Sequence, residues 1–113
     1  MPTAAEQPLY VAKAELFRAL GHPTRIRILE LLVERERPVS ELLAATGIEA
    51  SSLSQHLAVV RHTGLATSVR QGSAVVYRVS GPRVADFLQA ARVLLADTLG
   101  RTAQALADLD GTP

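Results

Sequence analysis

The chain has 113 residues, a formal net charge of +1 and no cysteine. This length supports one domain with a modest core and is too short for two. Without cysteine there is no disulfide framework, thiolate metal site or thiol redox switch. No apolar run approaches the ~18 residues needed to cross a bilayer, and the first ten residues lack the basic and apolar segments of a signal peptide. We therefore expect a cytoplasmic protein that does not engage a membrane.

Charge is distributed unevenly along the chain. Residues 50–85 contain four Arg and no Asp or Glu, whereas residues 30–49 carry five Glu against two Arg and residues 86–113 carry four Asp against two Arg. A basic segment between acidic flanks suits a polyanionic partner, because attraction to phosphates depends on local charge. Chance clustering on a solvated surface would give the same pattern, so charge alone does not decide between the two.

The first half of the chain predicts four helices. Residues 1–8 should form a flexible arm, and helical spacing of apolar residues then runs from Leu9 to Gly21. Pro23 suits the first turn of a second helix, which ends before residues 37–38. The expected core stripe of this second helix is Ile26, Leu29, Leu32 and Val33.

Two further helices and a hairpin follow. A short helix from Ser40 ends at Gly47, and another runs from about residue 50 to Gly64. Two short helices joined by a glycine-containing turn are typical of a helix-turn-helix. Residues 65–79 then combine β-branched and aromatic residues with the turn sequence RQGS, which predicts a two-stranded hairpin.

The last predicted helix spans residues 82–108, about 40 Å at 1.5 Å per residue. A strict 4-3 spacing from position 84 to position 109 holds six apolar residues and two threonines. So wide an apolar face must pack on its own domain or on a second subunit, and for so small a core we favour a dimer. The expected dimerisation residues are Leu9, Leu16, Val84, Leu88, Leu95, Leu99 and Leu106. Residues 9–109 would form the single domain and residues 110–113 a loose C-terminus.

The predicted fold class is mainly α with a β wing (α+β). In chain order it has four helices, two strands and a last helix, which is a winged helix-turn-helix, and it forms a homodimer through its terminal helices.

The segment SSLSQHLAVVRHTGL, residues 51–65, gathers serine, histidine and arginine and therefore raises the question of catalysis. A Ser–His pair needs an orienting carboxylate. No acidic residue lies between Glu49 and Asp86, and neither a GxSxG motif nor a Gly-rich phosphate loop occurs. We therefore expect no enzymatic activity.

A metal site on this helix is disfavoured by spacing. His56 and His62 are six residues apart and project about 120° from alignment, whereas histidine pairs that share a metal on one helix usually lie at i and i+4. We expect His22, beside Pro23, to assist the start of a helix and His56 to pack or hydrogen-bond within the fold. Spacing leaves open a site assembled across two subunits.

The third interpretation of this segment is DNA binding. A helical wheel places Leu53, Leu57 and Val60 on a buried face, with Ser51 and Gln55 on the opposite face. The exposed face is polar, short-chained and free of acidic residues, so it can lie in the major groove, where Ser and Gln bond to base edges and phosphates. An ordinary solvated face would carry Glu and Lys pairs. Positive charge to extend this surface would come from Arg61 on the helix and from Arg70 and Arg78 on the hairpin.

Three segments in order, ALGHPTRIRILELL, PVSELLAATGIEASSLSQHLAVVRHTGL and VRQGSAVVYRV, resemble the ArsR/SmtB family of bacterial winged-helix transcriptional regulators. The resemblance covers about residues 9–80, and the last helix occupies the family's dimerisation position. It implies a cytoplasmic homodimer that represses transcription from an inverted-repeat operator, with recognition helices about 34 Å apart. It also places wing contacts at Arg70 and Gln71. The complete predicted DNA-binding set is Ser51, Ser52, Ser54, Gln55, His56, Arg61, Arg70, Gln71 and Arg78.

The resemblance also implies metal-responsive repression, but the sequence departs from the family's ligand patterns. Pro38-Val39-Ser40 stands where thiolate-site members have Cys-x-Cys. The four ligand positions on the last helix are Gly81, Arg83, Leu94 and Asp97, of which only Asp97 is a ligand. Weak candidates for a nickel or zinc ion are His22, His56, His62, Asp86 and Asp97. The alternatives are a small-molecule effector, a regulatory partner protein that supplies the sensing, or a response to the protein's own abundance.

Overall fold

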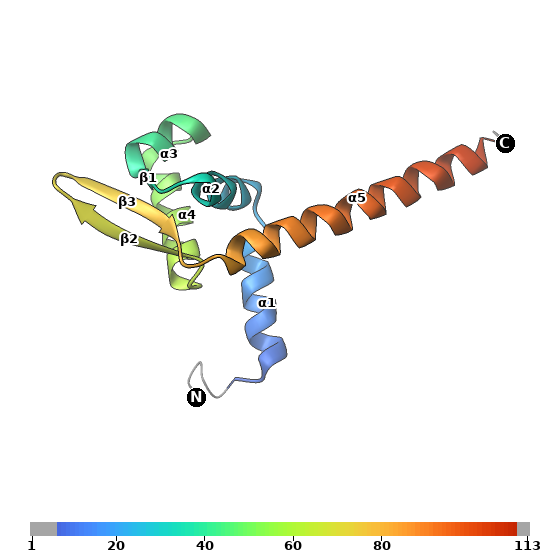
Figure 1. The fold of residues 1–113 in the computed structure, drawn as a ribbon, viewed down its shortest axis with the longest axis horizontal. Helices are drawn as coiled ribbons and strands as arrows, with labels where there is room; N and C mark the ends of the chain where they lie inside the picture. The colour runs from blue at the N-terminus through green and yellow to red at the C-terminus, as the bar shows by residue number, and fades with distance from the viewer. Residues whose placement is uncertain (1–6, 111–113) are drawn as a thin grey trace.

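The computed structural model describes residues 7–110, so the expectations for residues 1–6 and 111–113 lie outside the described residues. This part of the chain forms five helices and three strands, whose arrangement is drawn in Figure 1. In order they are α1 Leu9–Leu20, α2 Pro23–Glu34, β1 Arg37–Pro38, α3 Val39–Thr46, α4 Ala50–His62, β2 Ala66–Gln71, β3 Ala74–Val79 and α5 Arg83–Leu109. The winged helix-turn-helix prediction is confirmed, with each predicted helix boundary displaced by no more than a few residues.

The sheet contains one strand more than predicted. Its antiparallel order is β1-β3-β2, with Arg37 opposite Tyr77 and Pro38 opposite Val76. The sequence marked residues 37–38 only as the end of a helix, because two residues are too few to show the period-two alternation of a strand. The hairpin turn is also tighter than RQGS, since β2 runs to Gln71 and Gly72 turns the chain with a φ of 62°.

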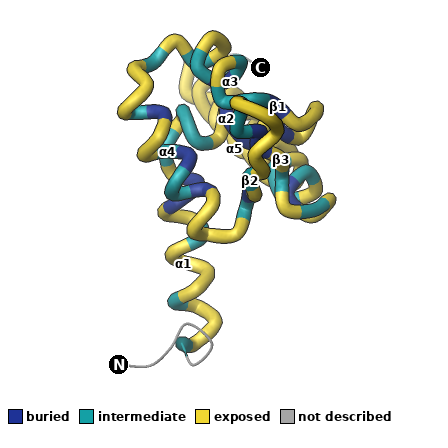
Figure 2. Tube along the Cα trace, turned by 90° about the vertical axis from the view of Figure 1, so that its left-hand side faces the viewer, coloured by how far each residue is buried: buried dark blue, intermediate teal, exposed yellow. Residues whose placement is uncertain are grey.

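The hydrophobic core lies where α2, α3, α4 and the sheet meet. Its largest fully buried side chains are Ile28, Leu29, Leu32, Leu42, Leu53 and Val60. Figure 2 shows this concentration of burial and the exposure of most of α1. The predicted stripe of α2 is only half right: Leu29 and Leu32 are buried, but Ile26 and Val33 are each 37% exposed. The reason is that α2 is central, packing on α1, α3, α4, α5 and β3, so that it buries more than one face.

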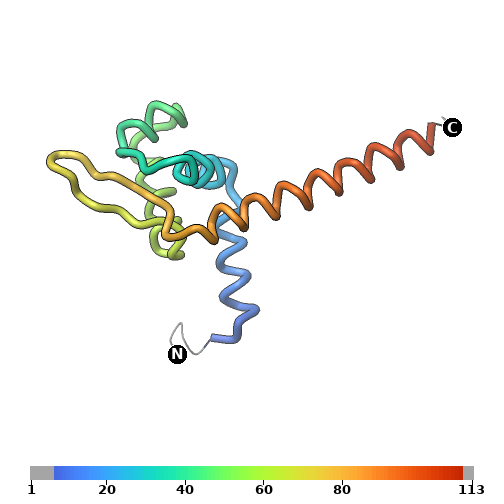
Figure 3. Tube along the Cα trace, viewed as in Figure 1, coloured from blue at the N-terminus to red at the C-terminus, as the bar shows by residue number. Residues whose placement is uncertain are grey.

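Helix α5 leaves the body of the protein after its first turns. Val84 is buried in the core, and Phe87 and Leu88 pack against it. Beyond Leu88 every residue to Asp110 is exposed except the half-buried Ala107, and the helix extends away from the other elements (Figures 1 and 3). Its apolar residues therefore have no cover from the described part of the chain. No helix within residues 7–110 is long and apolar enough to cross a membrane.

Candidate nucleic-acid interface

The turn between α3 and α4 depends on Gly47. This residue has a φ of 67°, in the left-handed region, and its N–H donates to the carbonyl of Leu43 at 3.0 Å. Glycine adopts this conformation without a steric penalty, which is why it so often ends helices. The predicted glycine turn is confirmed, and it directs the chain into α4.

Helix α4 has the two faces that its periodicity predicts. Leu53, Leu57 and Val60 are buried at 1%, 3% and 0% exposure. Ser51, Ser54 and Gln55 are exposed, and Ser52 is half-buried. The N-terminal half of the helix thus presents hydroxyl and amide groups without a carboxylate, at the end where the helix dipole is positive. The nearest acidic residue is Glu49, directly before the helix.

The hairpin β2–β3 packs against α3 and α4 and carries the predicted wing residues, which are exposed. Arg70 and Gln71 are the last residues of β2, opposite Val75 and Ala74. Arg78 on β3 is exposed and donates from Nε to the Thr67 hydroxyl across the strands at 3.4 Å. The hairpin extends on the side of the body opposite α5 (Figure 1), so the wing is free to contact a ligand that lies along α4.

Arg61, a further predicted contact of α4, lies at the opposite end of the helix from the serines. Arg61 and His62 are exposed at its C-terminal end, about 15 Å along the helix from Ser51. Helix-turn-helix proteins read base edges with the N-terminal residues of the recognition helix. The structure therefore separates Arg61 from the group formed by the serines and Gln55.

His56 points inward and meets His22. The two ring centroids are 4.3 Å apart, and His56 is half-buried. His22 precedes α2, and its Nδ1 accepts the Thr24 N–H at 3.1 Å, which confirms that His22 assists the start of this helix. Burial lowers the pKa of His56 from 6.5, and the nearby charges of His22 and Arg25 lower it further.

These histidines do not complete a metal site within one chain. His22 uses Nδ1 to cap α2, so the pair offers few free nitrogens where zinc takes four ligands. His62 is at the end of α4, and Asp86 and Asp97 are on α5. Among residues 7–110, no three His, Cys, Asp or Glu side chains lie close enough together to hold an ion. Within one chain, the donors of residues 7–110 do not fit nickel or zinc.

One structurally important residue, Arg37, was missed by sequence analysis. Its side chain is buried, and its Nε donates to the Leu31 carbonyl at 3.0 Å. Its Nη1 bonds Glu41 at 2.9 Å and its Nη2 bonds Glu34 at 2.6 Å. Arg37 thereby joins the end of α2 and the start of α3 to the wing sheet. No local pattern marks this role, because Arg37 lies between two helices and not on one.

A glycine-linked helix pair with an acid-free recognition face and an adjacent antiparallel hairpin defines a winged helix-turn-helix DNA-binding protein. The profile of the bacterial regulatory protein, arsR family, matches residues 22–68. The chain is 49% identical over 104 residues to the HTH-type transcriptional regulator Rv0081 of Mycobacterium tuberculosis, with 91% of each chain covered. The chain belongs to the arsR family and is a transcriptional regulator, which confirms the resemblance seen in the sequence.

Other relatives agree with this assignment. The HTH-type transcriptional repressor SmtB of M. tuberculosis is 36% identical over 84 residues, covering 74% of this chain and 62% of that protein. The crystal structure of M. tuberculosis Rv0081 has a TM-score of 0.81 and covers 86% of this chain and 98% of that one. The solution structure of the homodimeric winged helix-turn-helix domain of Mb0332 from Mycobacterium bovis has a TM-score of 0.74 at 28% identity, covering 86% and 90%.

Proposed function

We propose that the chain is a homodimeric repressor that binds an inverted-repeat operator through α4 and the wing. The observation that carries this proposal is the exposed, acid-free face formed by Ser51, Ser54 and Gln55. These side chains can bond base edges, and their small size lets the helix approach the floor of the major groove. Arg70 and Arg78 add positive charge, which phosphates and a narrow minor groove attract.

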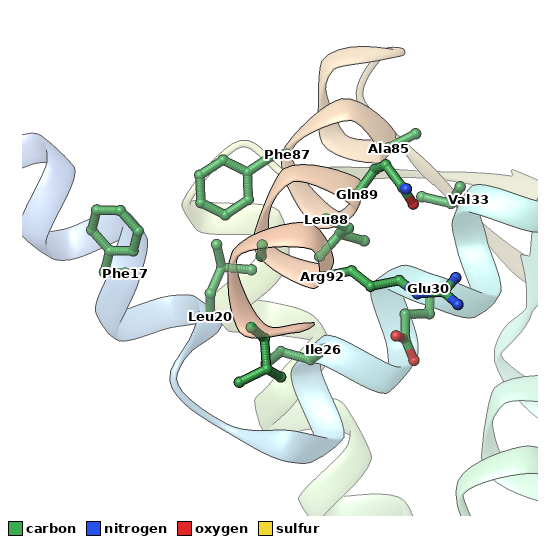
Figure 4. A pocket seen from close by; sticks show the side chains of 12 residues that line it. Phe17, Leu20, Ile26, Glu30, Val33, Ala85, Phe87, Leu88, Gln89 and Arg92 are labelled. Atoms are coloured by element: carbon green, nitrogen blue, oxygen red, sulfur yellow. The ribbon is translucent and has the colours of Figure 1, made fainter. Parts of the chain in front are cut away.

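The dimer is supported by uncovered apolar surface on the terminal helices. A groove of about 550 Å³ runs between α1, α2 and α5, with Phe17, Leu20, Ile26, Val33 and Leu88 among its lining (Figure 4). Phe17 is 58% exposed, although its ring lies 5.9 Å from that of Phe87. Apolar surface of this extent on a small protein marks an interface. The two-fold symmetry of such a dimer would also place its two α4 helices on the two half-sites of one operator.

The predicted dimerisation residues divide into two groups. Leu9, Leu95, Leu99 and Leu106 are more than half exposed, as a partner contact requires. Val84 is buried in the chain's own core, and Leu16 and Leu88 pack on that core, so these three contribute less surface to a partner. Phe17 takes their place in the proposed interface.

The test uses the purified full chain and a DNA duplex from its own promoter region. Fluorescence anisotropy should show tight binding that weakens steeply with salt, and a preference of at least ~10³-fold over a shuffled duplex of the same composition. Equal affinity for both duplexes, or affinity that does not depend on salt, would refute the proposal. Because no other protein is present, full-strength binding would also exclude a required partner protein. In vitro transcription from that promoter should fall when the chain is added, and a rise would identify an activator.

A further inference from the structure

A second hollow lies on the opposite side of α1 from the apolar groove. It has a volume of about 440 Å³ and is formed by α1, α2 and the C-terminal end of α4. Each helix supplies one basic side chain to it: Arg18 from α1, Arg25 from α2 and His62 from α4. Three separate helices thus bring three basic groups around one small space.

Arg25 is the innermost of these groups and is short of partners. It is half-buried, and its Nη2 donates to the Arg18 carbonyl at 3.3 Å. Its Nε is buried with no hydrogen-bond partner among the described residues. A guanidinium carries five N–H donors, so most of its capacity is unused. A partly desolvated cation in this condition attracts an anion more strongly than one in bulk water does.

No carboxylate of residues 7–110 forms an ion pair with Arg18 or Arg25. The ion pairs within residues 7–110 involve Arg27, Arg35 and Arg37, and none involves Arg18 or Arg25. Glu15 lines the same hollow but lies beyond ion-pair distance of both arginines. The Thr63 hydroxyl donates its proton to the Val59 carbonyl at 2.8 Å, so it is not free to donate to a ligand. The donors that remain for a ligand are therefore the two guanidinium groups and the His62 ring.

We propose that this hollow binds an oxyanion, a phosphate or carboxylate group held by Arg18 and Arg25 with His62 at the rim. Its volume lies in the range of small-molecule sites. The hollow joins α1 of the proposed dimer surface to the C-terminal end of the proposed recognition helix, so an occupant contacts both. The regulatory consequence rests on the proposed function, whereas anion binding itself does not. The oxyanion can come from a free small acid or from the DNA backbone, and two experiments separate these sources.

The first experiment measures binding of free anions by the full chain. Inorganic phosphate and succinate are titrated at constant ionic strength set with chloride, and the thermal unfolding midpoint is followed. A saturable rise is expected for one of the two probes, since a ligand that binds only the folded state stabilises it. Arg18→Gln should weaken the response at least tenfold. Because Arg18 is exposed, this change leaves the fold intact.

The matched control is Arg27→Gln. Arg27 is exposed on the same helix as Arg25 and pairs with Glu30 at 3.5 Å instead of lining the hollow. It removes the same formal charge, so it reports any general effect of lower positive charge. Identical responses of Arg18→Gln and wild type to both probes would show that free anions do not use this hollow.

The second experiment measures the salt dependence of operator binding. If the oxyanion is a backbone phosphate, Arg18→Gln should lower the slope of log K against log salt by about one, and Arg27→Gln should not. An unchanged slope together with an unchanged response to phosphate and succinate would overturn the proposal. Failure of the wild-type chain to prefer any operator would refute the proposed function and leave the free-anion result standing.

Discussion

The imidazole rings of His22 and His56 lie with their centroids 4.3 Å apart, so that the residue capping α2 packs on the middle of α4. His22 Nδ1 accepts the Thr24 N–H, which requires that nitrogen to be unprotonated. A proton on the half-buried His56 ring would place a positive charge against His22 and beside Arg25. The junction between α2 and the recognition helix is therefore most stable with neutral His56.

This contact predicts that the free energy of unfolding decreases as the pH is lowered below 6.5. Burial, His22 and Arg25 lower the pKa of His56 from 6.5 in the folded chain, while the unfolded chain keeps the ordinary value. Between the two values the unfolded state binds more protons, so the contribution of His56 is intact above pH 6.5 and is lost as the pH falls toward its lowered value. Urea unfolding at a series of pH values measures this slope. His56→Gln should flatten it, and His62→Gln on the same helix should not; an unchanged slope in His56→Gln would assign the effect to another group.

Replacing Arg37 should destabilise the fold. Arg37→Met removes the bonds to Leu31, Glu34 and Glu41 without leaving a buried charge. The free energy of unfolding should fall by about 1–3 kcal/mol. The loss is no larger because both carboxylates can recover their solvation at the surface. The control is Arg35→Met, which also removes a bond to Glu41 but from an exposed side chain, and it should change the free energy of unfolding little. Equal losses in chemical denaturation would contradict a special role for Arg37.

The recognition helix and the wing should respond differently to mutation. Gln55→Ala should weaken the binding free energy for the preferred operator by about 1–3 kcal/mol and change the base preference at one position of each half-site. Arg70→Ala should weaken binding to all duplexes alike and lower the salt slope by about one. Titration against a set of single-base operator variants measures both effects. Gln104→Ala, at an exposed glutamine on α5 outside the groove of the proposed interface, is the control, and loss of affinity in Gln55→Ala without a changed preference would remove Gln55 from the base-reading set.

The projecting helix should be needed for assembly. Leu99 is 60% exposed in the single chain, so Leu99→Glu leaves the protomer folded but places a charge in the proposed interface. Sedimentation equilibrium should show a monomer, and operator affinity should fall accordingly. Arg101→Glu adds an acidic residue two positions further on, on the other side of the helix, and should remain dimeric. A dimer of undiminished stability in Leu99→Glu would place the interface elsewhere.

Periodicity was a sufficient guide for α4, which buries one face. The spacing of Leu53, Leu57 and Val60 orients α4 correctly, because these residues pack on the core together whatever the angle of the helix. The same argument failed in part for α2, where Ile26 and Val33 stay partly exposed. A central helix buries several faces, and a single stripe does not describe it.

The sequence by itself determined the order of the five helices and the hairpin, the glycine turn at Gly47, the polar face of α4 and the family. Those features are local, or depend on short segments in a fixed order. Only the tertiary structure brought His22 to His56, placed Arg18 and Arg25 around one hollow with His62, and paired β1 with β3. These contacts join residues distant in the chain, and they depend on the angles at which helices and strands pack. Local side-chain spacing does not encode those angles, because they result from the packing of the whole core.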